Sequence, residues 1–584
     1  MKTVFKYLLP FKLKMSGGFT VKVIGTVVEL FLPYILSHIL KNVVVEQSVT
    51  KILFWGALMI ICALAACLCN VWANRMAAKI SREFSENVRR DLFDKTLHLS
   101  AAKTDEFTIP SLESRITTDT YHVHNFVGMI QRMGVRAPIL LFGGIAITLI
   151  MDSFLALAMI FVLPFIFVSV FFISKKGTPL YQRVQKSVDK MIRIVREDIQ
   201  GIRVIKALSK NEYEMERFDG SNKALVKDET KAGTVMNGVS PIMTLLMNAG
   251  IVAVIALSAN RVAGHQSDPE TVIAFMQYFT QISMSMMFIS RMFVMYTKCA
   301  ASAGRIAEVL NCDNDIKVEA KADFPNIDTD SHIVFNKVSF GYNSKYLNLK
   351  NIDFSIKRGG KLGIIGATGS GKSTVIKLLL RFYDVTKGAI YIDGEDIRTL
   401  SPESLYAKFG TAMQYDFIYN DTVLENIRFG RAISEEDVFK AAEIAQAADF
   451  ITAFPDKFNH ILSQNGTNVS GGQKQRILIS RALASKPEIL ILDDSSSALD
   501  YKTDANLRHA LAQNLKDTTL ITVAQRVSSV KDCDLILVLE QGEIIGAGTH
   551  EQLLGNCTEY KEISDSQMGG AFVEKRRPNG WRQR

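Results

Sequence analysis

Long apolar runs dominate the first half of the chain, and short alternating patterns dominate the second half. A bilayer core requires about 20 mostly apolar residues per helix. Runs of this kind predict six membrane-spanning helices, at Phe19–Leu40, Ile52–Trp72, Gly128–Met151, Phe154–Ser174, Pro241–Ala259 and Thr271–Tyr296. From Ile333 onward, strand and helix patterns alternate, which indicates an α/β domain that ends near residue 567.

The connections between the apolar runs are alternately very short and very long. Little more than Asp152 and Ser153 separates the third span from the fourth, whereas long basic segments follow the second and fourth spans. Basic loops are kept on the cytosolic side of a membrane, so both long segments are predicted to be cytosolic. They are rich in helix formers and poor in proline and glycine, which predicts helices that continue out of the membrane.

These patterns divide the chain into five predicted segments. The first is basic and apolar, is interrupted by Pro10 and lacks a signal-peptide cleavage motif, so it predicts an amphipathic elbow helix at the inner membrane surface. The segments are an elbow helix at 1–16, a transmembrane domain at 17–305, an acidic linker at 306–332, the α/β domain at 333–567 and a disordered tail at 568–584.

Composition supports a chain with a membrane part and a soluble part. Of 584 residues, 48% are hydrophobic, which is high for a soluble protein, and 22% are charged, too many for a chain wholly within the membrane. The formal net charge of +9 lies largely beside the apolar runs, which favours contact with a lipid bilayer over nucleic acid. Seven scattered cysteines without a CxxC pair are typical of core residues in a reducing compartment.

A phosphate-binding motif follows a strand pattern in the α/β domain. In KLGIIGATGSGKST, an apolar strand leads into a glycine-rich loop and then into the helix pattern TVIKLLLRF. Glycines let successive backbone N–H groups turn toward one phosphate chain, and the helix N-terminus faces the same anions. Lys372 is expected to reach the terminal phosphates and the Ser373 hydroxyl to ligate Mg²⁺. The predicted nucleotide contacts are Gly366, Ala367, Thr368, Gly369, Ser370, Gly371, Lys372, Ser373 and Thr374.

Two further motifs complete a nucleotide-binding pattern. The stretch ILILDDSSSALD ends a buried strand on two adjacent carboxylates, of which Asp493 is the candidate for the coordination shell of magnesium. In NVSGGQKQR, a Ser-Gly-Gly turn enters a helix at Gln473 and forms a second backbone anion nest. One domain with two phosphate cradles needs a second nucleotide to occupy the other cradle.

At this point the sequence resembles the ATP-binding cassette (ABC) family, whose signature is LSGGQ, with the motifs in the family's order. Tyr342, in VSFGY, matches the aromatic residue that stacks on adenine. Gln414, in TAMQYDFIYNDTVLENI, matches the glutamine that contacts magnesium and senses the membrane domain. The residues that match the signature, and would contact the ATP of a partner, are Ser470, Gly471, Gly472 and Gln473. The segment SALD, Ser497–Asp500, matches the loop between the two sites.

Six spans fused to one such domain resemble a half-transporter of the ABC exporter type. The resemblance implies an all-α six-helix transmembrane domain followed by an α/β P-loop NTPase domain with a helical signature subdomain. It also implies ATP and Mg²⁺ as cofactors, and assembly of two halves that sandwich two ATP molecules and switch the membrane domains between inward-facing and outward-facing states. The segments near Ala102–Ile109 and Lys210–Phe218 would be coupling tips. The expected location is the cell membrane, the inner membrane of a bacterium, with the nucleotide-binding domain in the cytosol.

Two catalytic positions depart from the family pattern. The family's general base is a glutamate, and this chain has Asp494. A side chain one C–C bond shorter retracts the carboxylate by roughly 1.5 Å, and a misplacement of about 1 Å can cost about 10²-fold in rate. At the position of the family's switch histidine the chain has Gln525, which donates a hydrogen bond but carries no proton-linked charge. We therefore predict ATP binding with weak hydrolysis at this subunit's own site.

The signature differs from the family pattern only by Val469 in place of leucine, so it should still complete the site of a partner. The combination is similar to the degenerate-site subunit of heterodimeric bacterial multidrug-type ABC exporters. The expected partner is a paralogous half-transporter that carries the intact glutamate and histidine.

The sequence says less about the transported substrate than about the nucleotide site. The sixth span is rich in Met and Phe, which adapt to varied apolar ligands but equally suit helix packing. Glu29 and Arg291 are ionisable at membrane depth, where such residues face a cavity or a partner. The leading hypothesis is an ATP-driven exporter of amphipathic small molecules, lipids or peptides. An importer of a bulky ligand such as a siderophore, and a non-transporting ATP-gated regulatory or channel subunit, are the alternatives.

Overall fold

The structure of the chain is a computed structural model, and it describes residues 1–263, 269–313, 316–321, 324, 326–327, 330–343, 346–414, 416–495 and 497–568. These residues form two compact units. The first consists of Met1–His98 and Phe107–Asp313, and the second of Leu99–Glu106 and Asn314–Arg584. The predicted disordered tail, apart from Met568, lies outside the described residues.

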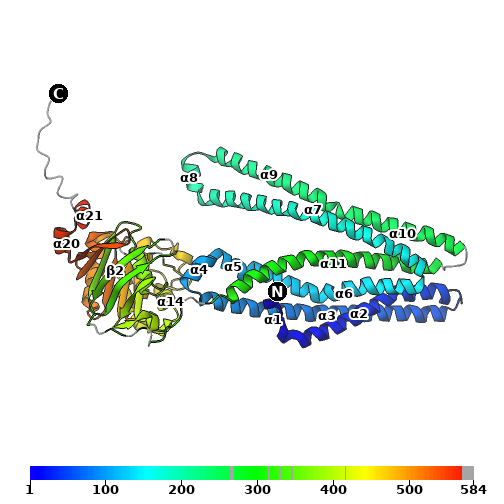
Figure 1. The fold of residues 1–584 in the computed structure, drawn as a ribbon, viewed down its shortest axis with the longest axis horizontal. Coiled ribbons are helices and arrows are strands. Elements are labelled where there is room, and N and C mark those ends of the chain that lie inside the picture. The colour runs from blue at the N-terminus through cyan, green and yellow to red at the C-terminus, as the bar shows by residue number, and fades with distance from the viewer. Residues whose placement is uncertain are drawn as a thin grey trace, which may run out of the picture. The chain divides into compact units, whose positions relative to one another are not determined.

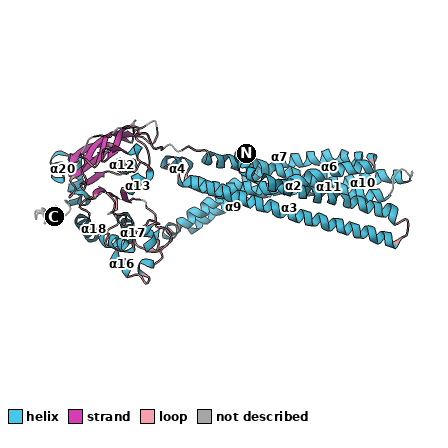
Figure 2. Ribbon diagram, turned by 90° about the horizontal axis from the view of Figure 1, so that it is seen from below, coloured by secondary structure: helices cyan, strands magenta, loops and turns pink. Residues whose placement is uncertain are grey.

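All the secondary-structure elements in the described residues of the first unit are helices. Its elements are α1 (Lys2–Leu8), η1 (Leu9–Phe11), α2 (Lys12–His38), η2 (Ile39–Val43), α3 (Val49–Leu97), α5 (Ile109–Ser114), η3 (Arg115–Asp119), α6 (Thr120–Met151), α7 (Ser153–Gln200), α8 (Ile202–Ala207), α9 (Asn211–Asn237), α10 (Val239–Ala263) and α11 (Pro269–Leu310). Within this unit, α2, α3, α6 and α11 run side by side, and α7 pairs with α9 and α10 (Figures 1 and 2).

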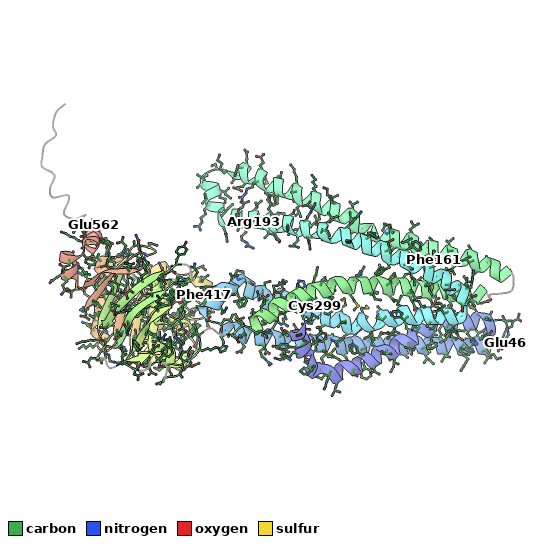
Figure 3. The ribbon with its side chains drawn as sticks, in the orientation of Figure 1. Glu46, Phe161, Arg193, Cys299, Phe417 and Glu562 are labelled. Atoms are coloured by element: carbon green, nitrogen blue, oxygen red, sulfur yellow. The ribbon has the colours of Figure 1, made fainter. Side chains whose placement is uncertain are left out.

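Several of these helices are longer than a membrane is thick. Helix α3 has 49 residues, or roughly 70 Å at 1.5 Å per residue, whereas the hydrocarbon core is about 30 Å thick. Helix α7 has 48 residues and changes character along its length, because Phe161 lies in its apolar part and Arg193 in its charged part (Figure 3). The two long basic segments are therefore helical continuations of membrane-spanning helices, as their composition predicts.

Five helical segments of the described chain are long and apolar enough to cross a bilayer. They are Lys2–Val43, Val49–Leu97, Ile109–Met151, Asn211–Ala259 and Glu270–Ile289. The fourth predicted span corresponds to a shorter apolar stretch, Ser153–Ser169, at the start of α7. The connection before it is a single residue, Asp152, whose carboxylate caps α7 by accepting hydrogen bonds from the N–H groups of Phe154 and Leu155 at 3.0 and 3.2 Å.

Helix boundaries in the first unit differ from two of the predicted ones. The predicted elbow helix, residues 1–16, is divided by a short turn at Leu9–Phe11, where Pro10 interrupts the helix. Helix α2 begins at Lys12 and so contains the end of the predicted elbow together with most of the first predicted span. The stretch Lys210–Phe218, predicted as a coupling tip, forms the beginning of the long helix α9. The separate short helix is α8, Ile202–Ala207, because Gly201 ends α7 and Ser209 adopts a left-handed backbone, φ 51°, before α9.

The second unit contains two sheets. The antiparallel sheet has the order β2-β1-β4-β5, formed by Leu349–Ile356, Ile333–Phe340, Lys387–Ile392 and Glu395–Asp396. The larger sheet has the order β10-β9-β3-β8-β7-β6, formed by Glu543–Gly548, Leu535–Glu540, Lys361–Gly366, Thr519–Val523, Ile489–Asp493 and Phe409–Ala412. In the larger sheet β6, β7, β8, β3 and β9 pair in parallel, and β10 pairs antiparallel with β9.

The second unit and its borders also contain helices. They are α4 (Ala101–Phe107), α12 (Lys372–Leu379), α13 (Pro402–Ala407), α14 (Val423–Arg428), α15 (Glu435–Ile444), α16 (Ala448–Thr452), α17 (Gly471–Leu483), α18 (Tyr501–Asn514), α19 (Val527–Val530), α20 (His550–Asn556) and α21 (Thr558–Met568), with short 3₁₀ turns at Ile397–Thr399, Lys457–Asn459 and Gln464–Gly466. All five residues of β7 are buried, which is why that strand reads as a continuous apolar run.

Candidate ATP site

The strand order of the larger sheet assembles the candidate site. The four strands β3, β8, β7 and β6 are adjacent and parallel, so their carboxyl ends lie at one edge of the sheet. The glycine-rich loop follows β3, Asp493 ends β7, Gln525 follows β8 and Gln414 follows β6. Four segments that are distant in sequence therefore converge on one place.

The backbone of the glycine-rich loop requires glycine at its end. Gly371 has φ +105° and caps the N-terminus of α12, and a Cβ there would lie 2.6 Å from Leu349 Cδ2. Gly369 also has positive φ, +85°. The Lys372 ammonium donates hydrogen bonds of 2.8 Å to the carbonyls of Gly366 and Ala367, so its charge lies over the loop. This arrangement is a backbone cradle with a cation at its rim, suited to a phosphate chain.

The acidic pair lies opposite the loop. Asp493 is 2% exposed, and burial raises the pKa of its carboxyl, while a hydrogen bond with Ser373 opposes that rise. A carboxylate beside a hydroxyl is an oxygen-donor set of the kind that Mg²⁺ prefers, so Ser373 and Asp493 fit the magnesium role, with the amide oxygen of Gln414 as the third predicted ligand. Burial lowers the pKa of Lys372, and the two carboxylates raise it, the larger contribution of the two coming from Asp494.

Asp494 is held by both glutamines. Its Oδ2 accepts hydrogen bonds from Gln414 Nε2 at 3.2 Å and from Gln525 Nε2 at 3.1 Å. Burial raises the pKa of the Asp494 carboxyl, whereas Lys372 and the two amides lower it. Its backbone is left-handed, φ 51°, a conformation that aspartate tolerates better than most residues. One oxygen of the candidate base is therefore already occupied by two donors.

These groups line a cavity of about 300 Å³. The predicted residues that line it are Thr368, Gly369, Gly371, Lys372, Ser373, Thr374, Gln414, Asp493, Asp494 and Gln525. Asn348, Val523 and Ala524 line it as well and were not predicted. Asn348 precedes β2, and only the fold brings it to the loop, since nothing in its local sequence resembles a nucleotide motif. Gly366, Ala367 and Ser370 belong to the loop but do not line the cavity.

The signature residues lie elsewhere in the same unit and do not line this cavity. Ser470 caps the N-terminus of α17: its side chain accepts the Gln473 N–H at 3.2 Å, and the Gln473 side chain accepts the Ser470 N–H at 2.9 Å. A Cβ on Gly472 would lie 3.1 Å from the carbonyl oxygen of Ala498, whereas Gly471 faces open space. The N-terminus of α17 is therefore capped by its own side chains and lies apart from the cavity that the P-loop residues line.

An aromatic cluster flanks the loop. Tyr342 is 44% exposed, its hydroxyl lies 3.3 Å from Thr374 Oγ1, and its ring meets the Tyr383 ring edge-on at 5.1 Å. The Tyr383 hydroxyl donates a hydrogen bond to the Asp105 carboxylate on α4. Burial first, and then Asp105, raise the pKa of Tyr383. The first predicted coupling tip is therefore joined to the predicted adenine-stacking residue through one tyrosine.

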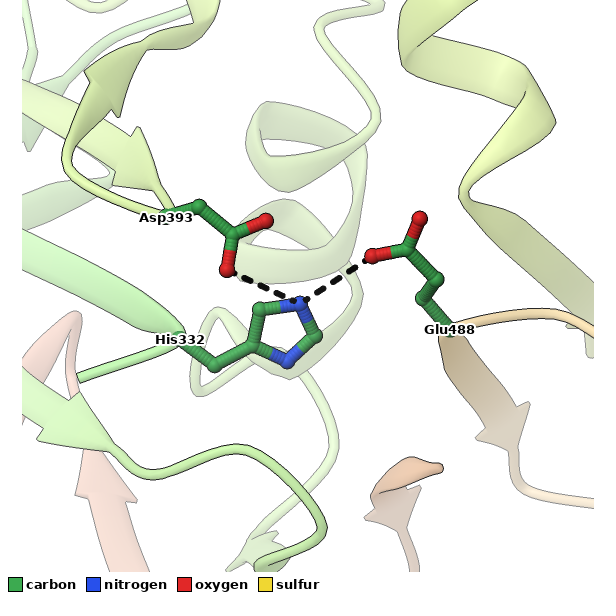
Figure 4. A group of neighbouring side chains, drawn as sticks. All are labelled: His332, Asp393 and Glu488. Atoms are coloured by element: carbon green, nitrogen blue, oxygen red, sulfur yellow. Dashed lines mark ion pairs between the residues drawn. The ribbon is translucent and has the colours of Figure 1, made fainter. Parts of the chain in front are cut away.

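His332, Asp393 and Glu488 form a separate cluster whose side chains are of the kind that bind metal ions (Figure 4). His332 Nε2 is buried without a hydrogen-bond partner and lies 3.7 and 3.8 Å from oxygens of Asp393 and Glu488. Arg358 binds these same two oxygens at 2.8 and 3.1 Å, and Lys408 lies within 3.4 Å of both carboxylates. Burial lowers the pKa of His332. The two cations already balance the two carboxylates, so a metal ion would have to displace a guanidinium.

Comparison with known proteins agrees with this geometry. Residues 15–286 match the family model of the ABC transporter transmembrane region, and residues 349–497 match that of the ABC transporter itself. The uncharacterised ABC transporter ATP-binding protein YfiB of Bacillus subtilis is 32% identical over 97% of this chain and 99% of its own. YknU of the same organism is 33% identical over 82% of each chain. The structure of a bacterial Atm1-family ABC exporter with ATP bound has a TM-score of 0.80, at 21% identity, and covers 98% of this chain and 99% of the other.

The chain belongs to the ABC transporter family. It is a multi-pass membrane protein with the fold of an ABC exporter half-transporter, in which a helical membrane domain precedes an α/β ATPase domain. The expected fold class is confirmed. The ATPase domain binds ATP, with Mg²⁺ as such domains generally require, and a half-transporter works as a dimer.

Proposed function

We propose that this chain is the degenerate-site subunit of a heterodimeric ATP-driven exporter of amphipathic molecules. In this proposal its P-loop binds ATP and hydrolyses it slowly, and its signature completes the hydrolytic site of a paralogous partner. The dimer would lie in a bacterial cytoplasmic membrane with its ATPase domains in the cytosol.

The observation that carries the proposal is the hydrogen bonding of Asp494. A general base needs a free carboxylate oxygen directed at the attacking water. Asp494 is one methylene shorter than the family's glutamate, and its Oδ2 accepts from both Gln414 and Gln525. Gln414 and Gln525 therefore engage one of the two carboxylate oxygens of Asp494, and the shorter side chain holds the other oxygen further back than a glutamate would.

Binding should be preserved where hydrolysis is impaired. Lys372 and the positive-φ glycines form the phosphate cradle, and Asp493 lies next to Ser373 as a magnesium ligand pair. The N-terminus of α17 is capped and open at Gly471, which suits a signature that faces a second nucleotide. The signature residues do not line the cavity of the P-loop, which supports a site shared between two subunits.

The test is vanadate trapping in the co-expressed pair, with a similar half-transporter that carries the glutamate and histidine. Trapped ADP is expected on the P-loop of the partner, and unhydrolysed ATP on this chain. Lys372→Ala in this chain should abolish ATP retention on it and leave trapping at the partner detectable. A Lys561→Ala variant, at an exposed position on α21, serves as the control for loss of a lysine side chain outside the site.

Equal trapping of ADP on both subunits would contradict the proposal, as would rapid hydrolysis by this chain alone. The direction of transport is tested separately. An exporter moves substrate into inside-out vesicles on addition of ATP, and an importer moves it out of them.

A further inference from the structure

A small cavity with a mostly apolar lining and a few polar groups lies among the membrane-spanning helices α2, α6 and α11. It has a volume of about 210 Å³, well above the roughly 10–15 Å³ that holds one water. Pockets for whole drug-sized ligands start at about 300 Å³, so this cavity suits a head group rather than a complete amphiphile. Its lining combines ionised, amide and hydroxyl groups with apolar side chains, namely Glu29, Arg136, Gln281, Thr280, Met284 and Phe288.

An ion pair spans the cavity wall. Arg136 Nη2 on α6 donates to Glu29 Oε1 on α2 at 2.5 Å. Charges at membrane depth are costly and are retained where they pair or line a cavity. Glu29 stands out in the sequence as an acid within an apolar run, whereas its partner Arg136, which is distant in sequence, is identified only by the structure.

The pair leaves hydrogen-bonding capacity unused. Glu29 Oε2, Arg136 Nε and Gln281 Oε1 are all buried without a hydrogen-bond partner within the described chain. A buried polar atom without a partner costs free energy, and a purely structural ion pair should have its remaining atoms satisfied. Two acceptors and one charged donor are thus gathered at one cavity.

The charge around the cavity is unbalanced. Lys22, which is 2% exposed, interacts electrostatically with Arg136, Glu29 and Arg132. Arg132 and Arg136 lie one helical turn apart on α6. Lys22 and Arg132 do not line the cavity, but together with Arg136 they place three cations near one carboxylate, so an additional anion would improve the balance.

We propose that this cavity binds the anionic head group of an amphiphile, a carboxylate or a phosphate, through Arg136. Glu29 and Gln281 accept hydrogen bonds from hydroxyl or amide groups of the same head group, and the apolar chain extends along Met284 and Phe288. The inference rests on the proposed transport function and specifies its substrate class.

The two members of the ion pair should have opposite effects on binding. Glu29 competes with the ligand anion for Arg136, so Glu29→Gln should tighten binding of an anionic amphiphile. Arg136→Met removes the cation and should weaken it by about tenfold or more, as expected for loss of a hydrogen bond to a charged group. A pair that only supports the fold would give losses in both variants.

The experiment measures equilibrium binding of radiolabelled dodecyl phosphate to the full-length chain in phosphatidylcholine nanodiscs. Competition with dodecanoate and with dodecyltrimethylammonium shows whether phosphate, carboxylate or any amphiphile is bound. Arg90→Met, a charge-matched change at a side chain that is 73% exposed on α3, is the control and should have no effect.

Tighter binding in Glu29→Gln, weaker binding in Arg136→Met and no competition by the cationic amphiphile are the expected results. Equal losses in both variants, no change in either, or equal competition by the cation would overturn the inference. Glu29→Gln is nearly isosteric, so it decides the outcome even if Arg136→Met fails to fold. Vanadate trapping does not involve this cavity, so failure here and failure of the degenerate-site proposal are distinguishable.

Discussion

The most direct prediction concerns replacing Asp494 and Gln525 by the glutamate and histidine of the family pattern. Asp494→Glu extends the carboxylate by roughly 1.5 Å, beyond the point where Gln414 and Gln525 hold its Oδ2 at 3.2 and 3.1 Å. Gln525→His removes one of these donors and returns a charge-bearing group beside the terminal phosphate. The first substitution thus lengthens the base, and the second removes the amide that holds it.

The expected magnitude follows from two terms. Correcting a displacement of more than 1 Å is worth about 10²-fold in rate, or about 2.7 kcal/mol at 1.36 kcal/mol per decade. A donor that supports the transition state is worth about 10²–10³-fold. Asp494→Glu alone should gain only about tenfold, because the position of the family's switch histidine still carries Gln525, whose amide has no proton-linked charge. The double variant should gain about 10²-fold or more, well above the gain of about tenfold from Asp494→Glu alone.

The assay is single-turnover release of phosphate from bound ATP by the purified full-length chain, with ATP binding measured in parallel. ATP affinity should change little, since Lys372 and Asp493 are untouched. Asp494→Asn controls for residual base activity and should reduce release further. The reasoning is refuted if the unsubstituted chain turns over as fast as the double variant, or if the double variant gains nothing while binding ATP normally.

Three further predictions follow from the same unit. Ser470→Ala should lower hydrolysis by the heterodimer without changing ATP binding to this chain. Ser470→Asp keeps the helix cap, which is worth about 1 kcal/mol. If both variants lose hydrolysis, the loss is due to the nucleotide contact and not to the missing cap. Tyr383→Phe removes the hydrogen bond to Asp105 and keeps the ring beside Tyr342, so ATP affinity should persist while substrate stimulation of ATPase activity falls; unchanged stimulation would exclude this link. Burial raises the pKa of Asp493, so protons compete with Mg²⁺ from a higher pH than for an exposed aspartate, and Mg²⁺-dependent ATP affinity should fall as pH is lowered. Asp493→Asn should abolish that pH dependence, measured by nucleotide binding with and without Mg²⁺.

The sequence was sufficient to predict those features that depend only on neighbouring residues. The glycine-rich loop is specified by glycines that permit positive φ, the membrane helices by apolar length, and the signature turn by a serine cap on α17. The short turn at Asp152 was also predictable, since an N-cap needs only its own neighbours. The exact position of α8 was not, because several helix-forming residues around Gly201 leave its boundaries to the backbone geometry.

The sequence by itself determined the class of protein, the nucleotide motifs and the two substitutions at catalytic positions. Only the tertiary structure decided that those substitutions touch each other. Asp494 and Gln525 meet because β7 and β8 are neighbouring parallel strands, and Gln414 joins them from β6 on the other side of β7. Likewise Arg136 becomes the partner of Glu29 only when α6 packs against α2. Contacts of this kind depend on strand order and helix packing between distant segments, and no local pattern carries that information.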